Sequence, residues 1–230
     1  MSTAPPPDAV AETAAPMEPS PPAPPTDVAG PKPIPSKCLP AAPDGLATYR
    51  LTVDQYHRIV EAGILEEEDR VELLNGYLSE TMPHSPRRGS AVRQWGNRLV
   101  RTCPEGMTPQ VQLPVTLSDS EPEPDLAIVR GSEADYVDRH PTGEDCLAVV
   151  EVAHTSLSLD RSKASIYAAA GIPEYLIIDL DRRRWEHYRQ PEGGEYASIR
   201  RGDARGTFEL PVGNGSVSFD FDAVFGPPAA

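Results

Sequence analysis

The stretch Leu147-Ala-Val-Val-Glu-Val-Ala153 decides the fold, because an apolar, β-branched run of this length is typical of a strand buried on both faces. Glu151 lies inside this run. An ionised carboxylate is costly to bury without a partner, so a purely structural core does not explain Glu151. The alternative is a one-sided strand on which Glu151 faces water.

A second carboxylate occupies a similar setting 26 residues before Glu151. Asp125 follows Glu123-Pro124 and precedes the apolar segment 126–129, which we predict to be another strand. Two carboxylates on neighbouring strands repel each other unless a cation lies between them, and oxygen ligands suit Mg²⁺. Taken alone, Asp125 is also explained as a turn residue after proline.

Lys163 adds a cation to this pair from a predicted helix over 160–170. The helix would connect the Glu151 strand to a buried strand over 175–179. A right-handed βαβ crossover makes these two strands parallel and brings the first turns of the helix, with Lys163, towards the carboxylates. The structural alternative is a surface lysine whose ammonium reaches water.

Glu72 is the fourth candidate, on the first strand of a predicted hairpin over 70–78. Asn75-Gly76 supplies the preferred two-residue turn, and Glu72 shares one face of the strand with Leu74. Glu72 is equally consistent with the outer face of a hairpin. His154 follows the strand of Glu151 and is interpreted as a hydrogen-bonded loop residue. Asp179 ends the strand over 175–179 and is interpreted as a structural residue or a cap of a helix or turn.

Together the four residues are suited to the hydrolysis of a phosphodiester bond. Asp125 and Glu151, helped by the backbone carbonyl of Val152, would hold one or two Mg²⁺ ions, which polarise a phosphate and lower the pKa of a bound water. Lys163 would neutralise developing charge or orient the water. Glu72 would complete the metal shell or hold a metal-bound water.

Other elements follow from caps and periodicity. We expect a helix from Thr52 to 62 and a second helix starting at Ser85-Pro86. The apolar face of this second helix would hold Ala91, Val92, Trp95 and Leu99. Further strands are expected over 110–117, 185–189 and 196–200, and a last extended segment over 208–221.

Composition divides the chain near Leu46. Fourteen of the 27 prolines fall in the first 45 residues, and this stretch has few large apolar side chains. Such a segment cannot bury enough surface to offset chain entropy, so residues 1–46 are predicted to be a disordered tail. Residues 47–226 form one predicted domain. No secretory signal and no apolar run long enough for a transmembrane helix occurs.

Charge and cysteine content narrow the function. The formal net charge is −14, and the predicted domain holds 19 basic and 30 acidic residues, which opposes nucleic-acid binding. Arg87-Arg88 and 182–184 are local basic groups, interpreted as solvated arginines or as a basic face. The three scattered cysteines, without a CxxC pair, argue against a disulfide framework or a zinc site and favour a reducing, cytoplasmic location.

At this point the chain resembles the Uma-type restriction endonucleases, a branch of the PD-(D/E)XK nuclease superfamily. The resemblance covers about residues 48–226, and the order and spacing of its motifs are specific together. The motifs are Val71-Glu-Leu-Leu-Asn-Gly-Tyr-Leu78, Ser85-Pro86, Glu123-Pro-Asp-Leu126, Val149-Val-Glu-Val152 and Lys163-Ala-Ser-Ile-Tyr-Ala-Ala-Ala-Gly-Ile-Pro-Glu-Tyr175, running into Leu176-Ile-Ile-Asp179.

The resemblance implies an α/β, restriction-endonuclease-like core with a mixed β-sheet flanked by helices. It implies that Asp125 and Glu151 are metal ligands and that Glu72 is the acidic residue found near the N-terminus of the family. It also implies that the lysine which usually lies two residues after the glutamate has moved to the helix, where Lys163 takes its role. That usual position holds Ala153 here. A histidine that often follows the family's Ser-Pro is replaced by Arg88.

These observations predict a Mg²⁺-dependent endonuclease acting on DNA, with Mn²⁺ as a substitute ion and with Glu72, Asp125, Glu151 and Lys163 as catalytic residues. A homodimer is expected from the resemblance. Two alternatives stay open. One is a non-catalytic module with a nuclease fold, and the other is a metal-dependent phosphodiesterase for a small substrate, which an acidic surface suits better.

Overall fold

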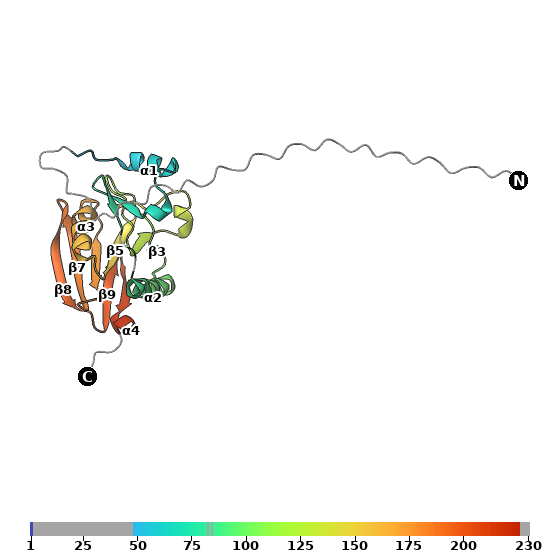
Figure 1. Ribbon diagram of the computed structural model, residues 1–230. Coiled ribbons are helices and arrows are strands. Elements are labelled where there is room, and N and C mark those ends of the chain that lie inside the picture. The colour runs from blue at the N-terminus through green and yellow to red at the C-terminus, as the bar shows by residue number, and fades with distance from the viewer. Residues whose placement is uncertain (2–47, 82, 84, 226–230) are drawn as a thin grey trace. The chain divides into compact units, whose positions relative to one another are not determined.

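The structure is a computed structural model, and it describes residues 1, 48–81, 83 and 85–225 (Figure 1). Apart from Met1, the predicted tail over 1–46 lies outside the described residues. The disorder of that tail and the domain limits 47–226 therefore stay predictions.

A six-stranded sheet in the order β3-β4-β5-β6-β7-β8 forms the centre of the fold (Figure 1). Its strands are β3 (Met107–Val111), β4 (Leu126–Arg130), β5 (Cys146–Ala153), β6 (Glu174–Asp179), β7 (Arg184–Glu192) and β8 (Glu195–Asp203). Strands β5 and β6 are parallel, and the other neighbouring pairs are antiparallel. The sheet is therefore mixed, as predicted, and the chain crosses from β5 to β6 through a helix.

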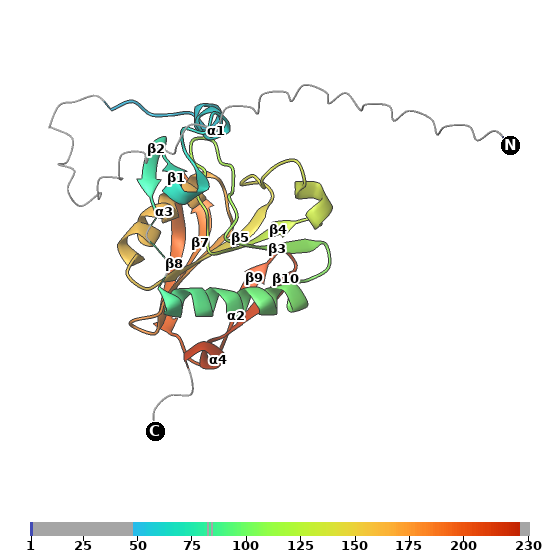
Figure 2. The same cartoon turned by 45° about the vertical axis from the view of Figure 1, so that its right-hand side comes forward.

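Helices and a hairpin cover the two faces of the sheet (Figure 2). One face packs against α2 (Pro86–Thr102), β9 (Thr207–Val212) and β10 (Gly215–Asp220), and the other against α3 (Leu157–Ala169). Strand β5 is buried along its whole length and divides its side chains between these layers. Val150 and Val152 lie on the α2 side, while Val149 and Ala153 lie on the α3 side.

A second hairpin lies against the first helix. Helix α1 (Val53–Glu61) begins at Thr52, which makes the predicted capping box with Gln55. The hairpin consists of β1 (Val71–Leu74) and β2 (Tyr77–Glu80), and Leu73 packs against Val53 and Tyr56 of α1. The remaining helices are α4 (Phe221–Phe225) and two short 3-10 helices, Glu67–Asp69 and Glu133–Tyr136.

The strand predicted over 110–117 is wrong in its limits. Strand β3 ends at Val111 because Gln112 adopts a left-handed φ of 52° and turns the chain out of the sheet. Beyond it the chain forms a loop, in which the Val115 amide donates to the Pro122 carbonyl at 3.0 Å.

The segment predicted to be one extended stretch over 208–221 is a hairpin instead. Strands β9 and β10 pair with each other antiparallel, and Gly213, with a φ of 55°, lies in the turn between them. Helix α3 begins at Leu157, three residues before the predicted start at 160. Both differences concern where an element turns or begins.

The described residues carry two free thiols, Cys103 and Cys146, whereas Cys38 lies outside them. No helix in this part of the chain has the length and apolar character needed to cross a membrane.

Candidate active site

Strand register places the two predicted metal ligands opposite each other. Leu126 pairs with Val150 in the antiparallel ladder of β4 and β5, so Asp125, one residue before β4, faces Glu151. Because side chains alternate along a strand, Glu151 lies on the same face as Val149 and Ala153, which is the face covered by α3. Both carboxylates are almost fully buried, with 1% of Asp125 and none of Glu151 exposed.

Lys163 joins these strands to the β1–β2 hairpin. Its Nζ lies 3.0 Å from Oε2 of Glu72 and 3.1 Å from Oε1 of Glu151. Glu72 and Lys163 are themselves buried, so the ammonium bridges two carboxylates in a region that water scarcely reaches. The alternatives of a solvated helix lysine and of an exposed hairpin glutamate are therefore excluded by the structure.

Asp125 is held by a cation and by the neighbouring strand. Both Nε and one terminal nitrogen of Arg88 donate to Oδ2 of Asp125, at 3.1 and 2.9 Å. The Val152 amide donates to the same oxygen at 2.8 Å, so this residue contributes its N–H in the structure. We call the set Glu72, Arg88, Asp125, Glu151 and Lys163 the buried charge cluster.

One face of α3 adds two residues that the sequence interpretation missed. Tyr167 donates its hydroxyl to Oε1 of Glu151 at 3.1 Å, and buried Asp160 accepts a hydrogen bond from the Ser156 hydroxyl at 2.7 Å. Residues three and four apart share a helix face, so the predicted helix already placed Asp160 and Tyr167 beside Lys163. The sequence offered less indication of Arg88, whose one unusual feature is that it is a cation in the first turn of a helix.

Burial and mutual repulsion shift the pKa values in this region. Burial, followed by the charge of Glu151, raises the pKa of Asp125 to about 6 and that of Asp160 to about 7. Burial also raises the pKa of Glu72, although Lys163 opposes the shift. Burial alone would lower the pKa of Lys163, but Glu151 and Glu72 outweigh it and raise that pKa above its ordinary value. Lys163 is therefore a permanent cation at neutral pH.

The use of lysine at this position is specific. The chain has three lysines, and Lys32 and Lys37 both precede the predicted domain, whereas the 18 arginines all lie after residue 47. Lysine presents a compact ammonium with three rotatable donors, while arginine presents a planar fork. The compact group fits a place where two carboxylate oxygens and little water surround one nitrogen.

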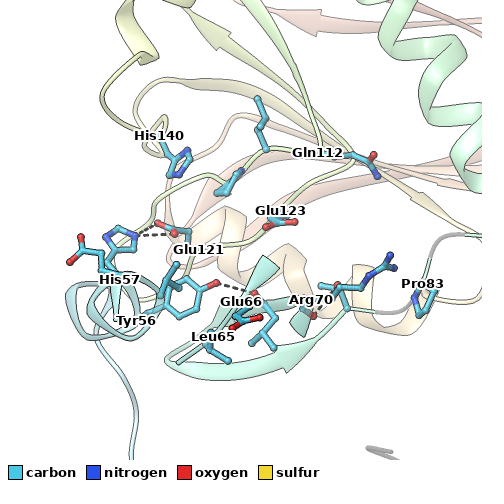
Figure 3. A pocket seen from close by; sticks show the side chains of 16 residues that line it. Tyr56, His57, Leu65, Glu66, Arg70, Pro83, Gln112, Glu121, Glu123 and His140 are labelled. Carbon is cyan, nitrogen blue, oxygen red and sulfur yellow. Dashed lines mark hydrogen bonds and ion pairs between the residues drawn. The ribbon is translucent and has the colours of Figure 1, made fainter. Parts of the chain in front are cut away.

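A cavity of about 970 Å³ has two lining residues that contact the buried charge cluster (Figure 3). Gln112 and Glu123 line it, and each also reaches a cluster carboxylate. The Gln112 side chain donates to Oδ1 of Asp125 at 3.4 Å, and the Glu123 amide donates to Oε2 of Glu72 at 3.2 Å. At the other end of the cavity His57 contacts the carboxylate of Glu121 at 2.8 Å (Figure 3). Gln112 and Glu123 thus connect the wall of the cavity with Asp125 and Glu72.

Two polar residues near strand ends lie in other interactions. His154 contacts Asp181, with Nε2 and Oδ1 3.2 Å apart. Asp179 accepts hydrogen bonds from the amides of Asp181 and Arg182 at 3.0 Å, and so closes the turn after β6, as its interpretation as a cap predicted. These side chains serve local structure.

The four predicted site residues are thus brought together by four separate elements, and their catalytic roles stay predictions. Within the described part of the chain, no three His, Cys, Asp or Glu side chains are already arranged around a metal position. One buried carboxylate oxygen of the cluster is, however, available to a ligand. Oε1 of Glu72 is buried and has no hydrogen-bond partner among the described residues.

The comparisons with known proteins agree with this fold. A crystal structure described as a putative nuclease belonging to DUF820 from Anabaena variabilis ATCC 29413 superimposes with a TM-score of 0.59 at 14% identity, covering 76% of this chain and 97% of that chain. This likeness shows a shared fold. No curated protein matches the chain. The model of the family described as "Uma2: Putative restriction endonuclease" matches residues 53–215. The chain therefore belongs to the Uma2 family.

Proposed function

We propose that this protein is a metal-dependent endonuclease that hydrolyses DNA phosphodiester bonds. The observation that carries the proposal is the arrangement of Asp125 and Glu151, which face each other on adjacent strands, with Lys163 bridging Glu151 to Glu72. Burying several charges is costly, and a hydrophobic replacement is often as stable, so stability alone does not explain such a set. Family membership supports phosphodiester hydrolysis as its purpose.

The donor set fits Mg²⁺ or Mn²⁺. Mg²⁺ is usually bound by one or two carboxylates and keeps several waters, and Asp125 and Glu151 supply two carboxylates. The buried Oε1 of Glu72, which lacks a partner among the described residues, offers a further oxygen acceptor for an ion or for its water. The absence of sulfur and imidazole from the buried charge cluster disfavours zinc and favours these harder ions.

Each residue has a role in the proposed reaction. A bound divalent ion would polarise the scissile phosphate and make its water more acidic. Lys163, with its raised pKa, stabilises negative charge on the phosphate while keeping its own proton. Glu72 holds Lys163 in place, and its Oε1 would complete the metal shell or accept a hydrogen bond from a metal-bound water. The Val152 amide and Tyr167 hydroxyl orient the carboxylates of Asp125 and Glu151.

The test is cleavage of supercoiled plasmid DNA by the full chain in Mg²⁺ or Mn²⁺. Asp125→Asn and Glu151→Gln keep the shape of each side chain but remove the charge, and we expect at least roughly 100-fold slower cleavage. Asp179→Asn is the matched control. Asp179 is also a buried aspartate, at the end of β6 next to β5, but its carboxylate caps a turn. Wild-type rates in the Asp125 and Glu151 variants would overturn the assignment.

One observation favours a second function, hydrolysis of a small phosphodiester. The cavity of Figure 3 is lined by Glu61, Glu66, Glu121 and Glu123, which repel long polyanionic DNA more than a compact substrate. Hydrolysis of bis(4-nitrophenyl) phosphate without plasmid cleavage would select this function. Mn²⁺ binding without either activity would select the non-catalytic module. The homodimer stays a prediction, which light scattering tests.

A further inference from the structure

Arg88 occupies a position where a helix disfavours a cation. Helix α2 has Ser85 as its N-terminal cap, whose hydroxyl accepts from the Arg88 amide at 3.2 Å, and Pro86 in its first turn. The first turn holds Arg87 and Arg88 and no acidic residue. The helix dipole repels positive charge at this end, so the placement of Arg88 costs stability within the helix. The interactions that compensate for this cost must therefore be made with residues outside the helix.

The guanidinium of Arg88 lies at the two proposed metal ligands. One terminal nitrogen is 2.9 Å from Oδ2 of Asp125 and 3.9 Å from Oε2 of Glu151. The side chain is 15% exposed, so this contact is made largely away from water. Arg88 thus places a positive charge beside both carboxylates of the pair.

Charge repulsion favours exchange over addition. A divalent ion held by Asp125 and Glu151 would lie next to the guanidinium of Arg88, which is 2.9 Å from Oδ2 of Asp125. Two positive charges at such close range repel each other strongly where little water screens them. Departure of the Arg88 side chain removes this repulsion and frees an oxygen of Asp125 for the ion.

We propose that Arg88 is an exchangeable counter-cation, which holds the metal position in the metal-free protein and must be displaced before a divalent ion binds Asp125 and Glu151. This inference rests on the ligand assignment made in the proposed function. Arg88 is a positioning residue here, since it keeps two repelling carboxylates together until the ion replaces it. The Arg88 side chain extends from the first turn of α2 and is already 15% exposed, so it reaches solvent from its present position.

Arg87 provides a matched control in the same helical turn. Its side chain donates to the Leu180 carbonyl at 2.8 Å and lies 3.6 Å from Asp181, and it is about half exposed, at 48%. Arg87→Gln therefore removes the same charge one residue away without a contact to either proposed ligand.

The experiment is a Mn²⁺ titration of the full chain, in which the electron paramagnetic resonance signal reports free Mn²⁺. We expect Arg88→Gln to bind Mn²⁺ at least roughly 10-fold more tightly than wild type, since the competing cation is gone. Arg87→Gln should bind within about 2-fold of wild type, because surface charge effects are small and screened. Circular dichroism confirms that each variant is folded before titration.

A second measurement uses wild-type protein and does not depend on the stability of a variant. The Nε–H of Arg88 donates to Asp125 at 3.1 Å, so its nitrogen-15 resonance reports this contact. Saturation with Mg²⁺ should shift that resonance and speed its hydrogen exchange. An unchanged resonance in the Mg²⁺-bound protein would overturn the exchange.

The outcomes separate this inference from the proposed function. Equal or weaker Mn²⁺ binding by Arg88→Gln overturns the role of Arg88, even if the wild type cleaves DNA. Tighter binding by Arg88→Gln supports that role, even if no DNA is cleaved. Absence of Mn²⁺ binding in both proteins overturns the inference and the proposed metal site together.

Discussion

The ammonium of Lys163 lies 3.1 Å from Oε1 of Glu151, and this contact ties helix α3 to strand β5 inside the protein. The same ammonium contacts Glu72, which is 91 residues away along the chain. A single side chain therefore connects the hairpin, the central sheet and the covering helix. Changes at this point should affect stability as well as catalysis.

Lys163→Met should destabilise the protein by about 3–5 kcal/mol, because it leaves Glu72 and Glu151 buried without their shared cation. Urea unfolding at pH 8 measures this loss. Lys163→Arg keeps the charge and should lose less stability, while its planar fork should still abolish cleavage. A methionine variant as stable as wild type would contradict the importance of this ion pair.

Tyr167→Phe should weaken Mn²⁺ binding by roughly 10–100-fold, since the tyrosine hydroxyl orients Glu151. Tyr175→Phe is the control, because the Tyr175 hydroxyl is buried on the same side but donates to the backbone carbonyl of Asp160. Both variants should lose about 1 kcal/mol of stability. Equal Mn²⁺ affinities for the two variants would remove Tyr167 from the site.

Asp160→Asn should change how stability depends on pH in metal-free buffer. The pKa of Asp160 is about 7 in the folded protein, above its ordinary value of 3.8, so the folded state binds its proton more tightly than the unfolded state. The stability from this proton is fully present below about pH 4 and is lost as the pH rises through 7.

The wild type should therefore gain stability relative to Asp160→Asn, by about 1 kcal/mol or more, as the pH falls from 8 to 5. Urea unfolding of both proteins at each pH measures the difference. A constant difference across this range would show that Asp160 titrates at its ordinary pKa.

Gly76→Ala should destabilise the hairpin that carries Glu72 more than an ordinary glycine replacement does. A Cβ at Gly76, which has a φ of 79°, would lie 2.8 Å from Cβ of Arg50 and 2.9 Å from the Leu51 carbonyl oxygen. Gly63 has a φ of 65° with no atom within 4 Å of an added Cβ. Thermal unfolding should show about 1 kcal/mol lost for Gly63→Ala and a clearly larger loss for Gly76→Ala.

The predicted elements succeeded where a local rule defines them. The capping box at Thr52 and the Ser85-Pro86 start place α1 and α2, and Ala91, Val92, Trp95 and Leu99 are buried as the periodicity predicted. The limits of β3 and the turn between β9 and β10 were missed, because they depend on single left-handed residues, Gln112 and Gly213, within otherwise extended patterns.

The sequence by itself determined the central strands and the residues that required explanation. A carboxylate within an apolar run is evidence of a site, because burial without a partner is too costly to persist. Glu151 and Asp125 could therefore be selected before any partner was known. The predicted βαβ crossover also gave the parallel pairing of β5 and β6.

Tertiary structure alone decided which partners these carboxylates have. Arg88 reaches Asp125 from another layer of the fold, and Glu72 meets Lys163 across 91 residues. Such contacts depend on how layers pack and on the rotamers of long side chains, which no local pattern records. The charge balance of the site, and with it the exchange proposed for Arg88, follows from that packing.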